Sequence, residues 1–507
     1  MTAPRLGSIR VAALACVAVV ACATTAAGQV TVVRTYPGLS GPTPAPNTAL
    51  STDMMCAVSP HFVVGFINAG FSVYSKDDGR ELRSHQTLEQ FWRAALENAD
   101  SRLADDPYDP RMFFDPLTSR WFATSDTRRR DGKGAGSLTR DMLLAVSGDA
   151  DPTHPWKAVV YTVPNESLEI DNIKIGIDRN GVYLTSLVAV TAKVVPMVAI
   201  PKADLLWKGG AAPSLANANY FETPKAPADP VRGTHGSRGD EGMIPAFDLN
   251  PGKAPGDPMI FINRFQAAWD GETVMQIRKV TWISPVKATM TGPFAVGLGR
   301  TYTEPKTQGI QPPLAQAGLV SPPIRPGGGR LVNAVVGHGS VWAIAATQVG
   351  DRTGAFWLEI AAGSLKLVQQ GTVGDATADI IFASLNVDAN GHVGIAMNRT
   401  SATEFPSIYV TGRLATDPPG TLRPMVKAVA GRHVFVKEGW DLSKPGSGTN
   451  YMDFSTVVVD PADPTLFWTY QEVPTNDCLP VEKNGGKFGT AFVAFRVGPA
   501  ARAGAKN

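Results

Sequence analysis

One strand–turn–strand phrase recurs along this chain, and it constrains the fold more than any other feature. The clearest copies are residues 174–188, KIGIDRNGVYLTSLV, and 386–400, NVDANGHVGIAMNRT. In both, an apolar strand leads into an Asp-x-Asn-Gly turn, and a second apolar strand follows. An Asn-Gly pair between apolar strands predicts a hairpin because both residues tolerate positive φ. Less regular copies of the unit lie at 56–68, 111–125, 255–265, 331–348 and 455–473.

Each of the seven hairpins is followed by at least one further apolar strand. Three or four short antiparallel strands per unit, repeated about seven times, predict an all-β β-propeller with six to eight blades. The composition agrees, since only 18% of the residues are charged while Gly (50) and Pro (40) are plentiful. One helix is expected after Thr87, with Gln90 completing a capping box.

The two ends of the chain are expected to lie outside the propeller. Residues 1–28 resemble a signal peptide, with Arg5 and Arg10 before a short apolar run and small residues up to Gly28. The Pro-rich stretch 29–50 is interpreted as a linker, residues 51–498 as one propeller domain, and 499–507 as a disordered tail. We therefore predict an exported protein, secreted or periplasmic, with lipidation at Cys22 as the alternative.

Net charge, apolar runs and cysteine content limit what the mature chain can bind and how it can be cross-linked. A net charge of +2 gives no electrostatic case for nucleic acid. No run after the leader is long and apolar enough to span a membrane, and a monomer is expected. The mature chain keeps Cys56 and Cys478, one near each end. In an oxidising compartment they are predicted to form a disulfide that joins the first and last blades; two separately buried thiols are the alternative.

Several phrases resemble a family of exported bacterial β-propeller proteins related in fold to the sialidase superfamily. They include RMFFDPLTSRWFATS (111–125), SLNVDANGHVGIAMN (384–398) and YMDFSTVVVDPADPTLFW (451–468). The resemblance implies a sialidase-like propeller and export, and implies no particular reaction. The sialidase motifs depart from their pattern here: Ile324-Arg325-Pro326 is out of order, and SKDDGREL (75–82) ends in Leu where a Ser-x-Asp-x-Gly-x-x-Trp box ends in Trp.

An aspartate stands just before the strand that opens most of the units. If these strands line the central channel, their first residues ring one of its mouths. Two interpretations stay open: each carboxylate caps a backbone turn, or part of the ring binds a ligand or Ca²⁺. The ring consists of Asp53, Asp109, Asp171, Asp257, Asp379 and Asp453, with Asn333 in place of the aspartate in the fifth unit.

Three further sets of residues are candidates for function. Asp388 and Asn390 echo the start of a calcium loop but lack its later Glu, so a hairpin turn is the competing interpretation. Aromatic residues beside irregular stretches are candidates for stacking on a sugar: Trp207, Trp269, Trp440 and Tyr220. Acidic residues that would serve a catalytic role are Asp171, Asp240, Glu241 and Asp453.

These features favour an extracellular binding module with a glycan or protein ligand at one mouth of the channel. The alternative is a carbohydrate-active enzyme, a sialidase-like glycoside hydrolase or a polysaccharide lyase. A hydrolase would need two carboxyl groups about 5 Å apart for retention or about 6.5 to 9.5 Å apart for inversion. Long Gly- and Pro-rich insertions at 209–258 and 302–330 are expected on one face, often the binding face of a repeat fold. No cofactor is expected beyond possible Ca²⁺.

Overall fold

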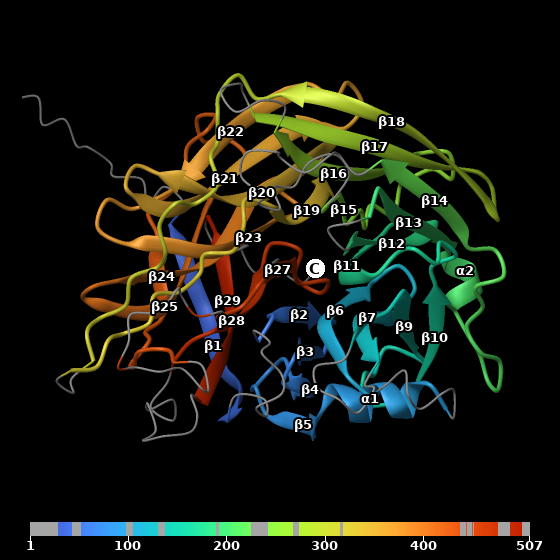
Figure 1. The fold of residues 1–507 in the computed structure, drawn as a ribbon, viewed down its shortest axis with the longest axis horizontal. Helices are drawn as coiled ribbons and strands as arrows, with labels where there is room; N and C mark the ends of the chain where they lie inside the picture. Colours follow the sequence, from blue (N-terminus) through green and yellow to red (C-terminus); the bar gives the residue numbers. More distant parts are fainter. Residues whose placement is uncertain are drawn as a thin grey trace, which may run out of the picture.

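The structure, a computed structural model, describes residues 29–42, 52–97, 105–129, 137–188, 192–224, 242–266, 273–314, 318–436, 443, 449, 451–474 and 487–498. These residues form seven antiparallel sheets that surround a central axis (Figure 1). The sheets are the blades of a β-propeller, so the predicted fold class is confirmed, with seven blades.

The first three blades follow one another along the chain. From the axis outward, the first contains β2 (Met55–Val58), β3 (Phe62–Ile67), β4 (Gly70–Ser75) and β5 (Glu81–Gln86). The second contains β6 (Pro107–Asp115), β7 (Arg120–Arg129), β9 (Asp141–Ser147) and β10 (Trp156–Thr162), with β8 (Ser137–Leu138) also beside β7. The third contains β11 (Ile170–Ile177), β12 (Gly181–Val188), β13 (Val194–Pro201) and β14 (Asn219–Pro224).

The next three blades repeat the same order. The fourth contains β15 (Ile244–Pro245), β16 (Met259–Gln266), β17 (Thr273–Ser284) and β18 (Lys287–Gly297). The fifth contains β19 (Leu331–Gly337), β20 (Ser340–Val349), β21 (Arg352–Ala361) and β22 (Leu367–Val373). The sixth contains β23 (Asp379–Val387), β24 (Val393–Ser401), β25 (Glu404–Arg413) and β26 (Val426–Val429).

The seventh blade joins the two ends of the chain. It contains β27 (Thr456–Val459), β28 (Phe467–Glu472), β29 (Lys487–Val497) and, as its outer strand, β1 (Val30–Pro42). Pairing between β1 and β29 runs from Val30 opposite Val497 to Pro42 opposite Lys487. The prediction of a linker over 29–50 is therefore wrong for residues 30–42, whereas 43–51 lie outside the described residues. Prolines suggested a linker, but an outer edge strand tolerates them because it needs fewer ladder N–H groups.

In the described part of the chain, two helices decorate the propeller. Helix α1 (Leu88–Ala95) begins after Thr87, whose side chain accepts from the Gln90 N–H while the Gln90 side chain accepts from the Thr87 N–H. The predicted capping box is thus confirmed. Helix α2 (Lys202–Leu205) is a single turn that follows β13.

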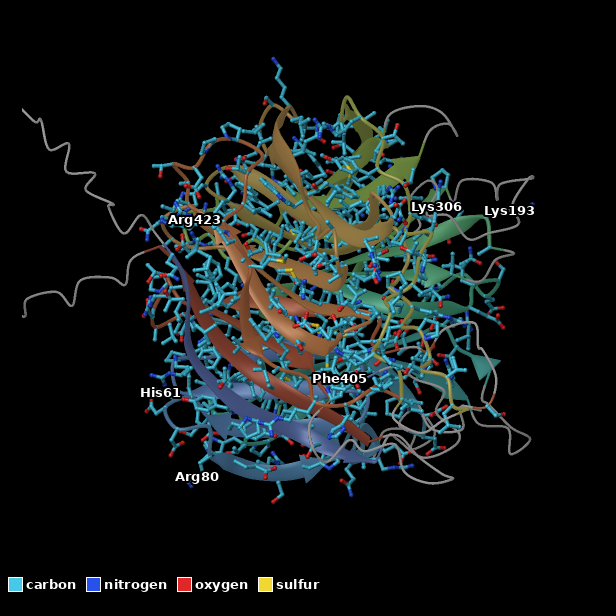
Figure 2. The ribbon with its side chains drawn as sticks, turned by 90° about the vertical axis from the view of Figure 1, so that its left-hand side faces the viewer. His61, Arg80, Lys193, Lys306, Phe405 and Arg423 are labelled. Atoms are coloured by element: carbon cyan, nitrogen blue, oxygen red, sulfur yellow. The ribbon has the colours of Figure 1, made fainter. Side chains whose placement is uncertain are left out.

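The two faces of the disc carry different turns. His61 lies in the β2–β3 turn, and Figure 2 shows it on the side of the disc opposite Lys193, which precedes β13, and Lys306. We call the side of His61 the hairpin face, because the turn after each innermost strand opens there. The side of Lys193 and Lys306 is the insert face, where the innermost strands begin.

Close packing between blades holds the ring together. At Gly65 a Cβ atom would lie 2.8 Å from the ring of the fully buried Tyr470, so β3 of the first blade needs glycine to lie against the last blade. Buried ion pairs add to this packing on the hairpin face. In each pair the carboxylate lies at the end of an innermost strand or directly after it, and the ammonium group comes from the next blade: Asp115 with Lys202 (2.9 Å), Asp178 with Lys253 (3.1 Å) and Asp460 with Lys76 (2.9 Å).

Candidate functional site at the channel mouth

A polar recess of about 200 Å³ opens on the insert face, at the beginning of the innermost strands. We call it the polar recess. Its wall combines carboxylates, cations and two aromatic rings: Asp109, Asp171, Asp453, Arg111, Lys174, Arg330, Asn172, Phe382 and Phe454. Because these residues come from five blades or the segments that precede them, the recess exists only in the closed ring.

An unusual backbone conformation positions several of these side chains. Asp53, Asp109, Asn172 and Phe382 all have φ between 49° and 53°. Left-handed backbone is uncommon for residues other than glycine. In β6, β11 and β23 this residue falls within a break of the ladder register, which re-aims the side chains that follow. The same kink therefore recurs at the start of four blades, and three of the kinked residues, Asp109, Asn172 and Phe382, line the recess.

A chain of hydrogen bonds connects neighbouring blades behind the recess. The Asp453 N–H donates to Asp53 Oδ1 (2.7 Å), and Asn68 Nδ2 donates to Asp53 Oδ2 (2.8 Å). Asn68 Oδ1 accepts from the Asp109 N–H (2.8 Å), and Asn172 Nδ2 donates to Asp109 Oδ2 (2.9 Å). Asp53 is thus a bridge between the last and first blades.

Two buried cations close the floor of the recess. The Arg111 guanidinium lies over the Phe454 ring (3.7 Å to the ring centre) and donates to the Ile173 carbonyl (2.8 Å) and Asn172 Oδ1 (3.0 Å). Lys174 Nζ donates to the same Asn172 side chain and to its carbonyl (3.4 Å). Both cations therefore interact with neutral oxygen atoms.

A third cation, Arg330, lies in the wall of the recess. Across the described ranges it makes no hydrogen bond and no ion pair. Nor does Asp109 or Asp171 come within 4.0 Å of a cationic nitrogen of Arg111, Lys174 or Arg330 in the part of the chain that the structure describes. Among the described residues, Asp109 and Asp171 thus form no ion pair with Arg111, Lys174 or Arg330.

Burial perturbs the titration of these groups. Burial raises the pKa of the Asp109 carboxyl well above its usual value, and the neighbouring Asp53 and Asp171 carboxylates add to the effect. Burial lowers the pKa of Lys174, helped by Arg111 and Arg330.

An outer pocket of about 400 Å³ extends the recess along the insert face. Residues 305–308 and 325–328 line it together with Met452 and Asp453, and the recess shares Pro326 to Gly328 and Asp453 with it. Both loops belong to the insertion 302–330 that the sequence places on the binding face. The two pockets together form a site that could hold more than one unit of a chain-like ligand.

The structure brings together part of the predicted aspartate ring. Asp109, Asp171 and Asp453 line the recess, and Asp53 lies directly behind it. Asp257 does not join them, because it precedes β16, the second strand of its blade, and its carboxylate accepts from the Ala254 N–H. The prediction that Asp257 precedes the innermost strand of the fourth blade is wrong, because that innermost strand is the short β15.

Asp379 also lies away from the recess. It begins β23, but its carboxylate accepts from the Thr353 N–H (3.1 Å) and pairs with Arg352 (3.2 Å) on β21. Three residues later, Phe382 occupies the position in the kinked strand that Asp53 and Asp109 hold in their blades. In the sixth blade the predicted aspartate therefore lies three residues before the kinked position, which Phe382 occupies.

The described aromatic candidates do not reach the channel mouth. Trp207 Nε1 donates to the Val146 carbonyl (2.9 Å), and the Tyr220 hydroxyl, on the outer strand β14, donates to Glu222 (2.7 Å). Phe382 and Phe454 are the aromatic residues that line the recess instead. The remaining candidates, Trp269, Trp440, Asp240 and Glu241, lie outside the described residues.

The Asp-x-Asn-Gly turn is held by its own aspartate. Asp388 Oδ1 accepts from the N–H groups of Asn390 (2.8 Å) and His392 (2.8 Å), as an Asx turn does. Within the described ranges, no group of three or more His, Cys, Asp or Glu side chains is arranged to hold a metal ion. No helix in the same ranges has the length and apolarity needed to cross a membrane.

The predicted disulfide stays a prediction. Cys56 is fully buried on β2, and burial raises the pKa of its thiol. Cys478 lies outside the described residues.

Sequence reasoning missed the three cations of the recess. A signal was present for two of them: Arg111 and Lys174 are basic residues inside otherwise apolar innermost strands, each two positions after a kinked residue. Arg330 gave no such signal, because it ends a long Gly- and Pro-rich insertion.

The fold and this recess define the class as a seven-bladed β-propeller with a polar pocket at one mouth of its channel. No protein-family model and no curated protein matches the sequence.

Among solved structures, the chain is similar to polysaccharide lyase Uly1 (9% identity, 90% of this chain and 91% of that chain, TM-score 0.41). It is also similar to the N-terminal domain of Nup159 (8%, 92% and 96%, 0.38) and to the sialidase of Trypanosoma rangeli (8%, 92% and 60%, 0.34). At these scores the matches carry no argument about function.

Proposed function

We propose that this chain is an exported binding protein that holds a glycan in the polar recess and outer pocket. The observation that carries the proposal is the set of unpaired charges in the recess. Asp109 and Asp171 offer acceptors, while Arg111, Lys174 and Arg330 offer donors. Charges that the protein itself leaves unpaired are available to hydrogen-bond a ligand.

The chemistry of a sugar suits this arrangement. Each hydroxyl group both donates and accepts, so a ring with several hydroxyls can bridge a carboxylate and a guanidinium group that do not contact each other. Phe382 and Phe454 add apolar surface for the C–H face of the ring. The recess has room for one sugar unit, and the outer pocket accommodates the units that follow.

The test is binding of the mature chain, from Gln29, to an array of mono- and oligosaccharides. We expect saturable binding to a small set of glycans and a loss of at least tenfold in affinity in both Asp171→Asn and Arg330→Met. Asp171→Asn keeps an acceptor for the Tyr108 hydroxyl, which now donates to Asp171 Oδ1 (2.9 Å). Arg80→Met is the matched control, because Arg80 is exposed on the hairpin face (Figure 2). Absence of glycan binding, or equal binding by all variants, would contradict the proposal.

A second candidate is a carbohydrate-active enzyme, which one observation favours. The raised pKa of Asp109, caused first by burial and then by Asp53 and Asp171, is the property of a general acid. If the chain is a hydrolase or lyase, some of the bound glycans are cleaved, and Asp109→Asn abolishes cleavage while retaining binding. If the bound glycans stay intact after prolonged incubation with the wild-type chain, the enzyme is contradicted and glycan binding remains the proposed function.

A further inference from the structure

The channel opens on the hairpin face into a second and larger cavity. Its volume is about 740 Å³, and the innermost strands of all seven blades contribute to its wall. We call it the apolar cavity. Most of its lining is aliphatic or aromatic, and examples from five blades are Met55, Met112, Ile175, Ile244 and Val457. Its size and lining are those of sites for small apolar ligands.

The polar side chains deep in this wall already have partners. Asn333 exchanges two hydrogen bonds with the backbone of Leu385 (2.6 and 3.2 Å). Asn386 donates to the Val457 carbonyl (2.9 Å). These side chains are therefore not available to hydrogen-bond a ligand rich in hydroxyl groups, in contrast to the recess on the other face.

Two cations lie between the apolar cavity and the polar recess. Arg111 and Lys174, with Val332, are the residues that line both the apolar cavity and the polar recess. Arg111 is 8% exposed and Lys174 is 6% exposed. Neither has a carboxylate oxygen within 4.0 Å in the described part of the chain, and Arg111 Nη1 makes no hydrogen bond there. Neighbouring carboxylates such as Asp109 and Asp126 act on both cations without forming an ion pair, so an anion in direct contact with the cations is stabilising.

We propose that the apolar cavity binds a small amphipathic carboxylate, such as a fatty acid, with its carboxylate at Arg111 and Lys174. The hydrocarbon body then fills the channel toward the hairpin face. Burial of that body is favourable in proportion to the apolar surface that it removes from water. The cationic end selects the anion over a neutral molecule of equal length. This site differs from the glycan recess in face, most of its wall chemistry and ligand class, but it shares Arg111, Lys174 and Val332 with the recess.

The experiment is isothermal titration calorimetry of the full chain with dodecanoate, below its micelle concentration, with 1-dodecanol as the neutral probe. We expect one dodecanoate per chain, bound at least tenfold more tightly than dodecanol. Lys174→Met should weaken dodecanoate at least tenfold. Arg330→Met is the matched control: it removes a cation that lines only the recess, and should bind dodecanoate at least as tightly as wild type.

A second variant guards against misfolding of Lys174→Met. Val459 lines the cavity and is half-buried, so Val459→Phe narrows the cavity near the hairpin face while leaving both cations in place. We expect Val459→Phe to weaken dodecanoate binding with an unchanged circular dichroism spectrum. Absence of dodecanoate binding, equal affinity for the two probes, or unchanged binding in Val459→Phe would overturn the proposal.

Discussion

Buried charges occur on both faces of this propeller, and they are arranged in opposite ways. On the hairpin face, the carboxylate of Asp115 lies 2.9 Å from Lys202, and both side chains are almost fully buried. On the insert face, Asp109 and Arg111 are also buried but make no ion pair with each other. The first arrangement stabilises the contact between two blades. The second leaves hydrogen-bonding capacity unused, and it does so beside a pocket.

The difference teaches where function is to be sought in a repeat fold. Every blade needs its neighbours, so paired charges at blade contacts are explained by the ring itself. Charges that converge from several blades without forming ion pairs are not required for closure. They destabilise the folded protein unless a ligand pairs with them. The predictions below change one arrangement at a time.

The largest effect is expected from removing one partner of a hairpin-face pair. Lys202→Met leaves the buried Asp115 carboxylate without its cation, so the free energy of unfolding should fall by about 3–5 kcal/mol. Chemical denaturation measures this change. Lys208→Met, at an exposed position six residues later, should stay within about 0.5 kcal/mol of wild type. A small effect of Lys202→Met would mean that the pair does not hold the blades together.

Opposite pH dependences should distinguish an unpaired from a paired carboxylate. Burial raises the pKa of Asp109, so the folded chain binds its proton more tightly, and the contribution of Asp109 to stability falls as pH rises from 3.8 through the raised pKa. Hydrogen bonds from Arg496 lower the pKa of Asp463 to about 2, so its contribution is present above 3.8 and is lost as pH falls toward 2.

Unfolding free energies of wild type, Asp109→Asn and Asp463→Asn across this range check the sign. The difference between wild type and Asp109→Asn should change above pH 3.8, by about 1.4 kcal/mol for each unit of pKa shift. The difference for Asp463→Asn should change below pH 3.8. If both differences vary in the same window, the two carboxylates are not in contrasting environments.

The smallest effect on stability is expected at the free cation of the recess. Arg330 makes no hydrogen bond or ion pair with the described residues, so Arg330→Met should leave the free energy of unfolding within about 0.5 kcal/mol of wild type. The same variant should lose glycan binding. Loss of stability in Arg330→Met would show that the arginine serves the fold.

The fold could be predicted from the sequence because its evidence is local and repeated. Hairpin turns such as Asp178 to Gly181 identify a blade without knowledge of any other blade, and seven copies are enough to predict a ring. The outer strand β1 could not be found in this way. Its partner β29 lies more than 440 residues later, and the prolines at its end favoured a linker.

The candidate site could be predicted only in part. The aspartates before the innermost strands indicated the correct mouth, since Asp109, Asp171 and Asp453 line the recess. The predicted aspartate positions were wrong in two blades that depart from the common spacing. Asp257 precedes the second strand of the fourth blade, and Phe382 occupies the kinked position in the sixth blade. Pairing across blades is a tertiary property, so the sequence could not tell which charges would be neutralised.

The contrast between paired and unpaired cations is tested most directly by bromide. In a crystal of the full chain soaked in bromide, the anomalous map should show an ion in the polar recess beside Arg330 and the Arg111–Lys174 floor. It should show none beside Lys202, Lys253 or Lys76, whose carboxylate partners already neutralise them. Bromide at those lysines, or a recess whose cations pair with Asp109 and Asp171 and exclude the ion, would contradict the account.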